Sequence, residues 1–422
     1  MNQFTEILPG IRLRCAQTDR FKSSCLSISL LRPLCREEAA KNALLSNVLM
    51  QGTENHPDMT SLSMALDELY GTSLGPLCRK IGDIQTVGFY MSCLDDRYAM
   101  EGDSILAPAL ELLGEVLLQP CLEDGAFRED VVALEKENLI NTIEAAINDK
   151  RAYADRNMLK ALCREDTYGT PRLGEAEDVA AITARNLYAH YKMILETSRV
   201  EIFYGGSMSP ETVAELLKKV LGKLPRGKLC QTRFFAIPRH EGVQHLEETM
   251  EVTQGKLSMG FTTGITAKNK LFPAMVVFNT LFGGDMTSKL FVNVREKQSL
   301  CYYISTAMIS TKGIMTLSCG IETRDYEKTV GEIMRQLSLC QQGQITEAEL
   351  SAAKKAIASG LRSVEDSLAS MEELTAFHVL GGIPMDRAAY LQAILEVTAE
   401  DAAEVARSIQ LDTVFFLRGV QA

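Results

Sequence analysis

The fold is decided by the stretch Leu281-Phe-Gly-Gly-Asp-Met-Thr-Ser-Lys-Leu290 and the run that follows it, Phe291-Val-Asn-Val-Arg-Glu-Lys-Gln-Ser-Leu-Cys-Tyr-Tyr-Ile-Ser305. The pattern predicts an apolar helix, a Gly-Gly turn, a second helix carrying Arg295, and a strand through Tyr302. Such a bend can bring a guanidinium and a phenol to one side of a cleft, where they could hold a peptide carbonyl and its oxyanion. The residues alone leave another interpretation open, a solvated helix end and a tyrosine on a sheet face.

The chain repeats one order of elements. Leu26–Leu30 and Leu257–Phe261 read as matching strands, and Gly52 falls opposite Gly283 at the same offset. In each half a strand, a linker, an apolar helix, a glycine turn, an amphipathic helix and a further strand follow in that order. The repeat indicates that the two halves share one fold.

The segment 224–242 interrupts this pattern. It contains Pro225 and Pro238 and a local group of basic residues in an otherwise acidic chain, so it reads as a linker. We therefore predict two homologous domains, 1–223 and 243–422. Each is expected to be α+β, with a sheet covered by helices on one face.

Composition restricts the class of protein. The 422 residues carry a net charge of −11, which argues against a nucleic-acid binder, since such proteins show a basic patch or stripe. The 11 cysteines form no C-x-x-C pair and fit free thiols in a reducing compartment. The sequence pattern indicates no signal peptide, and no apolar run is long enough to predict a membrane span. We expect a cytoplasmic protein without nucleic-acid or membrane partners.

The stretch LFGGDMTSKLFVNVREKQSLCYYIS resembles the second-half signature of the insulinase/pitrilysin peptidases, which include the mitochondrial processing peptidases. These are inverted zincins whose first half carries H-x-x-E-H. The resemblance runs through nearly the whole chain and implies the LuxS/MPP-like metallopeptidase fold, with two homologous domains of antiparallel-rich sheets. It also implies that Arg295 and Tyr302 match the family's substrate-holding Arg/Tyr pair.

The family's zinc motif is missing. Anchored on Gly52 and the threonine after it, the first histidine's place falls to Ala43, the general-base glutamate's to Ser46 and the second histidine's to Asn47. Ala43 has no ligand atom, Ser46 is no base at neutral pH, and Asn47 binds zinc poorly. We therefore expect no zinc in this chain, and a zinc ion only in a partner subunit.

Other candidate metal or nucleophile positions are weaker. The later family pattern of two glutamates seven apart maps onto Glu135 and Thr142, so that carboxylate pair is also broken. His240 and His245 have a spacing compatible with metal, but solvated linker histidines explain them better. Cys301 lies beside Tyr302 without a histidine near it in sequence, which makes a thiol nucleophile remote.

The sequence favours a zinc-less, catalytically incomplete peptidase homologue that binds extended peptide. In two-chain members of the family one subunit can bear the zinc while the other supplies the Arg/Tyr pair, and this chain resembles the second kind. Its partner would be a zinc-bearing family subunit or a second copy of itself. The alternative is a non-proteolytic scaffold or binding protein. A bacterial branch of the family is associated with modification of elongation factor P, and the loss of the histidines is compatible with that branch.

Overall fold

The computed structural model describes residues 4–383 and 386–419. The chain forms two compact units. Unit 1 consists of Met1–Glu144, Thr170–Arg233 and Glu365–Leu380, and unit 2 of Ala145–Gly169, Phe234–Val364 and Gly381–Ala422. Among the described residues, no helix is both long and apolar enough to span a membrane.

The units differ from the predicted domains 1–223 and 243–422 in one respect. The main division falls between Arg233 and Phe234, inside the segment that reads as a linker, but residues 145–169 and 365–380 each belong to the unit of the other half. Each exchanged segment contains a helix that packs on that unit's sheet. Helical periodicity reveals an apolar face, but it does not reveal which sheet will cover that face.

Unit 1 is built on a sheet with the strand order β1-β2-β9-β3-β6-β4, in which β5 also pairs with β6. β2 and β9 run parallel and the other pairs are antiparallel. Its strands are β1 (Thr5–Leu8), β2 (Ile11–Gln17), β3 (Ser23–Pro33), β4 (Ser73–Leu77), β5 (Lys80–Ile81), β6 (Ile84–Leu94) and β9 (Arg199–Gly206), with a small separate hairpin of β7 (Leu122–Glu123) and β8 (Ala126–Phe127).

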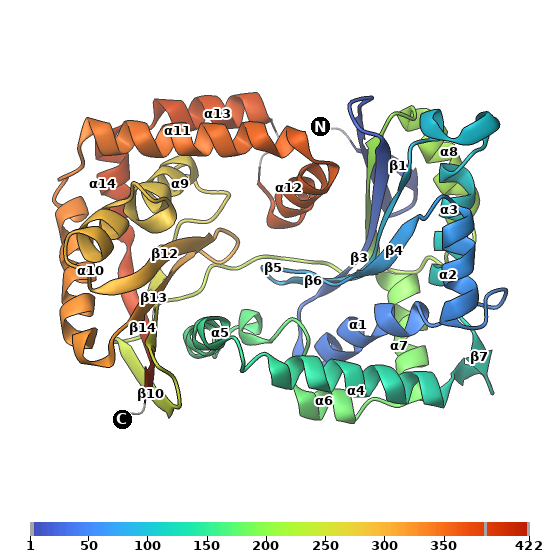
Figure 1. Cartoon of the computed structure of the whole chain (residues 1–422), viewed down its shortest axis with the longest axis horizontal. Coiled ribbons are helices and arrows are strands. Elements are labelled where there is room, and N and C mark those ends of the chain that lie inside the picture. The colour runs from blue at the N-terminus through green and yellow to red at the C-terminus, as the bar shows by residue number, and fades with distance from the viewer. Residues whose placement is uncertain (1–3, 384–385, 420–422) are drawn as a thin grey trace. The chain divides into compact units, whose positions relative to one another are not determined.

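Most helices of unit 1 cover one face of this sheet (Figure 1). They are α1 (Arg36–Leu49), α2 (Met59–Glu68), α3 (Leu106–Leu118), α4 (Glu129–Ala145), α6 (Ala176–Ala180), α7 (Ala184–Thr197) and α8 (Pro210–Leu221), and α12 (Leu368–Gly381) lies on the opposite face. α8 begins at a favourable start sequence, because the Ser209 hydroxyl accepts a hydrogen bond from the Thr212 amide and proline occupies the first turn.

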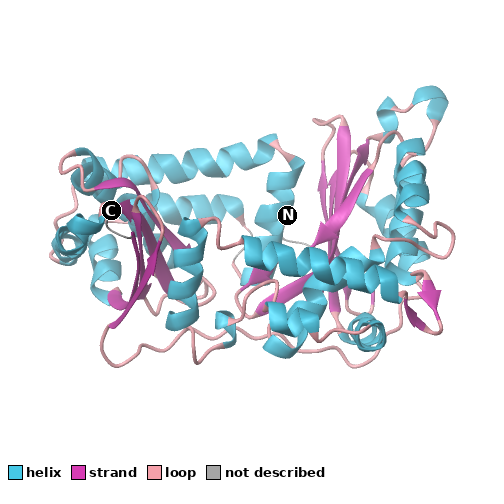
Figure 2. Cartoon of the chain, turned by 60° about the horizontal axis from the view of Figure 1, so that its bottom comes forward, coloured by secondary structure: helices cyan, strands magenta, loops and turns pink. Residues whose placement is uncertain are grey.

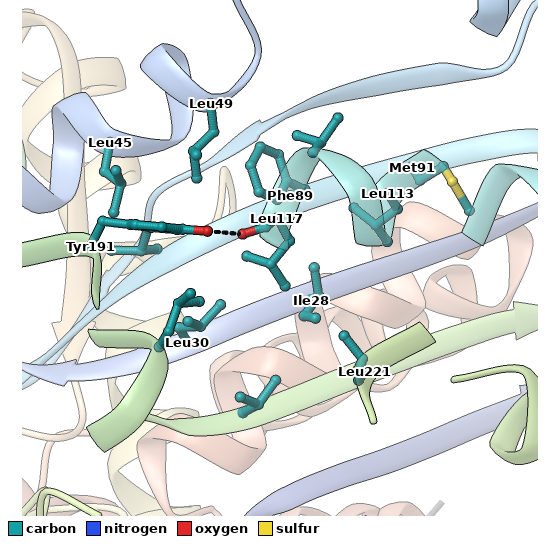
Figure 3. Close-up of a cluster of buried hydrophobic side chains, with 14 of the residues drawn as sticks. Ile28, Leu30, Leu45, Leu49, Phe89, Met91, Leu113, Leu117, Tyr191 and Leu221 are labelled. Carbon is teal, nitrogen blue, oxygen red and sulfur yellow. Dashed lines mark hydrogen bonds between the residues drawn. The ribbon is translucent and has the colours of Figure 1, made fainter. Parts of the chain in front are cut away.

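Period-two alternation separates the two faces of the unit 1 sheet. Along β3, Leu26, Ile28 and Leu30 point into the core, while Ser27 and Ser29 point the other way. Figure 3 shows Ile28 and Leu30 packed among side chains from α1, α3, α7 and α8, with the Tyr191 hydroxyl donating to the Leu117 carbonyl at 2.9 Å. The second face of the sheet is consequently polar, and it carries charged side chains such as Arg14 and Glu201.

Unit 2 repeats this plan with the strand order β10-β14-β11-β13-β12. Its strands are β10 (Gln244–Met250), β11 (Gly255–Thr262), β12 (Cys301–Ile309), β13 (Ile314–Ile321) and β14 (Gln410–Gly419). Its helices are α5 (Lys150–Leu162), α9 (Phe272–Asn279), α10 (Tyr326–Gln341), α11 (Glu347–Ser363), α13 (Arg387–Glu396) and α14 (Ala399–Ser408). Figure 2 distinguishes the helices and strands of both units.

The sheet orders confirm the internal repeat. Read from one edge, β2-β9-β3-β6-β4 of unit 1 corresponds to β10-β14-β11-β13-β12 of unit 2. The only parallel pairs among these strands are β2 with β9 and β10 with β14, which occupy the same place. Leu26–Leu30 and Leu257–Phe261 lie in the equivalent strands β3 and β11, as predicted. The α+β class and the two homologous sheets are confirmed.

The expectation that helices cover each sheet on one face needs one addition. The exchanged helix α5 packs on the second face of the unit 2 sheet, where Met158 and Leu162 lie against Gly260 of β11. A Cβ at Gly260 would fall 2.5 Å from the Met158 sulfur, so glycine permits this close approach. In unit 1 the exchanged helix α12 takes the same role, so each sheet carries several helices on one face and a single exchanged helix on the other.

Candidate functional site

The Arg/Tyr segment of unit 2 is irregular in three consecutive places. Arg295 lies on a π-helical turn, Phe291–Glu296, which differs from the regular helix that the sequence predicts. Ser299, in the turn that follows, adopts a left-handed conformation with φ of 51°. The register of β12 against β13 then shifts between Cys301 and Tyr303. π-Turns, strained backbone and bulges concentrate at functional sites, so this segment is a candidate site on backbone geometry.

Tyr302 is the residue that the shift leaves without a partner in the neighbouring strand. A bulge of this kind re-aims a side chain, and Tyr302 is 51% exposed. Its hydroxyl donates a short hydrogen bond to the Glu322 carboxylate, at the end of β13. That hydrogen bond raises the pKa of Tyr302 above its usual value, because the nearby negative charge disfavours the phenolate.

Arg295 has different partners. Its guanidinium lies over the Phe291 ring at 4.6 Å from the centroid and pairs with Glu296 at 3.7 Å. The side chain is 41% exposed, so it remains accessible. No hydrogen bond or ion pair between Arg295 and Tyr302 occurs among the described residues, and each side chain is held by its own neighbours.

Cys301, between these two residues, is buried against Cys319 of β13. A hydrogen bond with Cys319 lowers the pKa of Cys301, and the positive charge of Arg295 contributes in the same direction. The thiol therefore lies within the electrostatic reach of the guanidinium. Because the sulfur is enclosed by the sheet, a nucleophilic role for Cys301 gains no support.

The degenerate zinc positions lie on α1 of unit 1. Ala43 and Ser46 are buried in the core, and the Ser46 hydroxyl has no hydrogen-bond partner among the described residues. Asn47 is half-buried, and its amide lies 3.5 Å from the Ala43 carbonyl of its own helix. These three side chains offer one amide oxygen and one hydroxyl, which is not a zinc ligand set.

The two later positions lie on α4. Glu135 is buried and accepts hydrogen bonds from Gln51 at 2.8 Å and from Asn138 at 3.2 Å. Glu135 therefore does not lie on a solvated helix face, because Gln51, just after the end of α1, covers that carboxylate. Thr142 is exposed, and its hydroxyl donates to the Asn138 carbonyl at 2.8 Å.

The residues present do not fit the zinc ion of catalytic relatives. Glu135 is already satisfied by two neutral amides, and the other four positions supply no imidazole and no second carboxylate. Within residues 4–383 and 386–419, no group of three histidine, cysteine, aspartate or glutamate side chains could hold a metal ion. No reaction step through a metal is derived for this chain.

Two histidines have structural roles that sequence reasoning did not find. His190 is buried, and burial lowers its pKa to about 4; its Nε2 lies 2.7 Å from the Asn42 amide oxygen. His240 pairs through Nδ1 with the buried Asp412 at 2.9 Å, so it anchors the linker rather than lying in solvent. His245, on β10, is exposed as predicted. The partners of His190 and His240 are distant in sequence, so no local pattern could identify them.

Known proteins resemble this chain in sequence and in fold. The family model of the peptidase M16 inactive domain matches residues 181–357. The "Probable inactive metalloprotease YmfF" of Bacillus subtilis (strain 168) is 32% identical over 412 residues, covering 98% of this chain and 96% of YmfF.

Two solved structures share the fold. A conserved protein from Enterococcus faecalis V583 has a TM-score of 0.91 and 27% identity, with full coverage of both chains. A peptidase M16 inactive domain from Pseudomonas fluorescens has a TM-score of 0.80 and 17% identity, covering 100% of this chain and 98% of that one. The fold of sheets and helices is thus shared with both of these solved proteins.

Proposed function

Because the chain belongs to the M16 peptidase family, also called the insulinase family, and lacks its H-x-x-E-H motif, we propose that it is a non-catalytic peptide-binding subunit. In this proposal it presents Arg295 and Tyr302 to a zinc-bearing family subunit, and the pair of chains cleaves peptides in the cytoplasm. The observation that carries the proposal is the exposure of both side chains on a π-turn and a bulge, in a chain whose zinc motif is lost at all three helix positions.

The chemistry assigned to the two side chains follows from their donor groups. A guanidinium offers a rigid fork of N–H donors that suits a peptide carbonyl and the oxyanion formed from it. A phenol offers one O–H donor, and the raised pKa of Tyr302 keeps that proton in place at neutral pH. Donors aimed at developing negative charge are among the largest contributions to acyl-transfer catalysis.

The edge strands suggest where an extended peptide would pair. β4 and β12 occupy equivalent edges of the two sheets. β4 contains Pro76, which has no N–H group and weakens any ladder formed along that strand. β12 has no proline and carries Tyr302, so a peptide that pairs along β12 would bring its backbone beside the phenol.

Reconstitution with a zinc-bearing H-x-x-E-H subunit from the same genome tests the proposal. The chain alone should hold no stoichiometric zinc and cleave no fluorogenic peptide, and the mixture should be active. Arg295→Ala should reduce kcat/KM of the mixture by about 10²–10³, by analogy with the removal of an oxyanion donor. Tyr302→Phe, which removes only the hydroxyl, should reduce it in the same direction.

Lys297→Ala is the matched control, since it removes an exposed positive charge two residues from Arg295. It should leave the activity of the mixture unchanged. Peptide cleavage at the wild-type rate by the Arg295→Ala mixture would refute the assigned role. Stoichiometric zinc with activity in the single chain would refute the loss of the metal site itself.

A second candidate is a scaffold or binding protein without a part in proteolysis. The observation that favours it is that both side chains are already engaged, Tyr302 with Glu322 and Arg295 with Glu296 and Phe291. In that role the pair would be packing residues retained from a catalytic ancestor. A self-associating chain that binds peptide without gaining activity from any zinc-bearing partner would support this candidate.

A further inference from the structure

The polar face of the unit 1 sheet holds three arginines around one glutamate. Arg12 and Arg14 lie on β2, and Arg199 and Glu201 lie on the adjacent strand β9. All four alternate with core residues, so their side chains leave the same face of the sheet. We call this group the arginine cluster.

One carboxylate serves all three guanidinium groups. Arg14 makes a short contact with one oxygen of Glu201, and Arg199 and Arg12 approach the other oxygen at 3.1 and 3.8 Å. The Phe4 ring lies against Arg12 and Arg14, with guanidinium carbons 4.4 and 5.2 Å from its centroid. The arginine cluster therefore carries more positive than negative charge.

Among the described residues, no acidic group besides Glu201 forms an ion pair with these arginines. Glu6 lies opposite Arg12 in the register of β1, but it makes no ion pair with Arg12, and its carboxylate accepts a hydrogen bond from the Gly10 amide at 2.8 Å. Glu372 of α12 lies near Arg14, but it accepts two hydrogen bonds from Arg79. Both acids thus have partners of their own.

Several polar atoms of the arginine cluster are buried without a hydrogen bond. Among the described residues, the Nε atoms of Arg12 and Arg14 have no hydrogen-bond partner. The Nε of Arg199 and one carboxylate oxygen of Glu201 lie 3.1 Å apart as an ion pair that lacks hydrogen-bond geometry. Buried guanidinium groups are ordinarily paired, because leaving such donors unsatisfied is unfavourable. Arg12 and Arg199 are nevertheless about 30% exposed, so a ligand can reach them from solvent.

We propose that the arginine cluster is a binding site for one oxyanion group, a carboxylate or a phosphate, on a small ligand or a peptide. The planar fork of guanidinium matches both groups through paired N–H···O bonds. A bound oxyanion would neutralise part of the excess charge and give the exposed arginines the partners that Glu201 alone cannot provide. The site lies on strands that carry neither Arg295 nor Tyr302, so it does not depend on the proposed function.

Calorimetric titration of the full chain tests the proposal, with three probes at constant ionic strength: inorganic phosphate, an acetylated Ala-Gly hexapeptide with a free C-terminus, and its amidated form. Chloride is the reference anion, because it contributes screening without an oxyanion geometry. Phosphate or the free-terminus peptide should bind more tightly than chloride, and the probe that binds identifies the source of the group.

Variants then assign the binding to the arginine cluster. Arg12→Gln and Arg199→Gln should each weaken binding roughly tenfold or more, as expected for the loss of a charge-assisted hydrogen bond. Glu201→Gln should strengthen it, since the internal competitor for the guanidinium groups loses its charge. Arg128→Gln, an arginine paired with Asp130 elsewhere in unit 1, is the matched control and should bind as the wild type does.

Three results would overturn the proposal. The first is binding of both oxyanion probes no tighter than chloride. The second is equal weakening by Arg128→Gln and Arg12→Gln, and the third is equal binding of the free and amidated peptides with no binding of phosphate. A melting curve for each variant shows whether it is folded. If Arg12→Gln fails to fold, the gain expected from Glu201→Gln decides the outcome.

Discussion

At the scale of single residues, one acceptor defines the state of Tyr302. Glu322 follows β13 and accepts a hydrogen bond from the hydroxyl of a tyrosine that a bulge has turned toward solvent. This hydrogen bond is compatible with both candidate functions. In a peptidase subunit it would hold the phenol in place until a substrate arrives, and in a scaffold it satisfies the hydroxyl permanently. A substitution at Glu322 therefore changes the pKa of Tyr302 while leaving the tyrosine itself in place.

Glu322→Gln should lower the pKa of Tyr302 toward its ordinary value. The hydrogen bond with the Glu322 carboxylate is the largest cause of the raised pKa, and a neutral amide removes the charge that opposes the phenolate. Titration of ring-labelled tyrosine by NMR measures the change. Glu327→Gln, on α10, is a suitable control, and an unchanged Tyr302 titration in Glu322→Gln would contradict the assignment.

The carboxylate of Asp95 should make the free energy of unfolding depend on pH. Burial alone would raise its pKa, but hydrogen bonds from Arg97, Ser207 and Ser24 outweigh burial and lower the pKa to about 2. Because the folded value lies below the unfolded value of 3.8, the stabilisation is present above about pH 4 and is lost as the pH falls toward 2.

Asp95→Asn should therefore reduce the free energy of unfolding at pH 7 by about 2 kcal/mol, and by less at pH 3. Urea unfolding at the two pH values measures the difference. The exposed Asp19→Asn serves as control. A deficit of the same size at both pH values would show that the charge of Asp95 is not its cause.

At the scale of elements, a buried ion pair attaches the exchanged helix α12 to unit 1. Glu372 accepts hydrogen bonds from both terminal nitrogens of Arg79, at 2.7 and 2.6 Å, and from the Ser27 hydroxyl at 2.6 Å. The glutamate is 2% exposed, so its charge depends on these partners. Removing one member of such a pair leaves an uncompensated charge on the other.

Glu372→Gln should destabilise the docking of α12 by about 2–3 kcal/mol. This lies toward the lower end for breaking a buried ion pair, because the side chain of Arg79 retains some exposure to solvent. Hydrogen exchange of the α12 amides should accelerate by roughly 30-fold or more. The neighbouring Glu373→Gln, on the exposed side of the helix, should leave the exchange rates unchanged. Equal rates in Glu372→Gln and the wild type would show that the ion pair does not hold α12.

At the scale of the whole molecule, the exchange of segments makes each half dependent on the other. Residues 145–169 carry buried apolar side chains, among them Ala154, Met158 and Leu162, whose covering sheet lies in the second half of the sequence. Residues 365–380 come from the second half of the sequence, but they belong to unit 1, whose sheet lies in the first half. A cut at Arg233 therefore separates both helices from their sheets.

The fragment 1–233 expressed alone should expose apolar surface, bind the dye ANS and associate. Co-expression with 234–422 should restore a soluble complex with little dye binding, because each helix regains its sheet. Size-exclusion chromatography and ANS fluorescence measure both outcomes. A monomeric fragment 1–233 that binds no dye would show that the exchanged helices are dispensable.

Much of the element list follows from the sequence. Apolar spacing and capping residues predict helices such as α8, and the repeat predicts that β3 and β11 are equivalent. Short edge strands such as β4 do not follow from the sequence, because few residues carry their pattern. The π-turn at Arg295 was also missed, since its residues are equally compatible with a regular helix.

What the sequence alone determined is the chemistry that the chain lacks. Ala43, Ser46 and Asn47 supply neither the imidazoles nor the carboxylate of the zinc motif, whatever the fold, since ligand atoms belong to the side chain itself. The tertiary structure alone decided which sheet covers each exchanged helix, that Glu322 meets Tyr302, and that three arginines share Glu201. These contacts join residues far apart in the chain, and hydrophobic periodicity reports only on neighbours within a few residues.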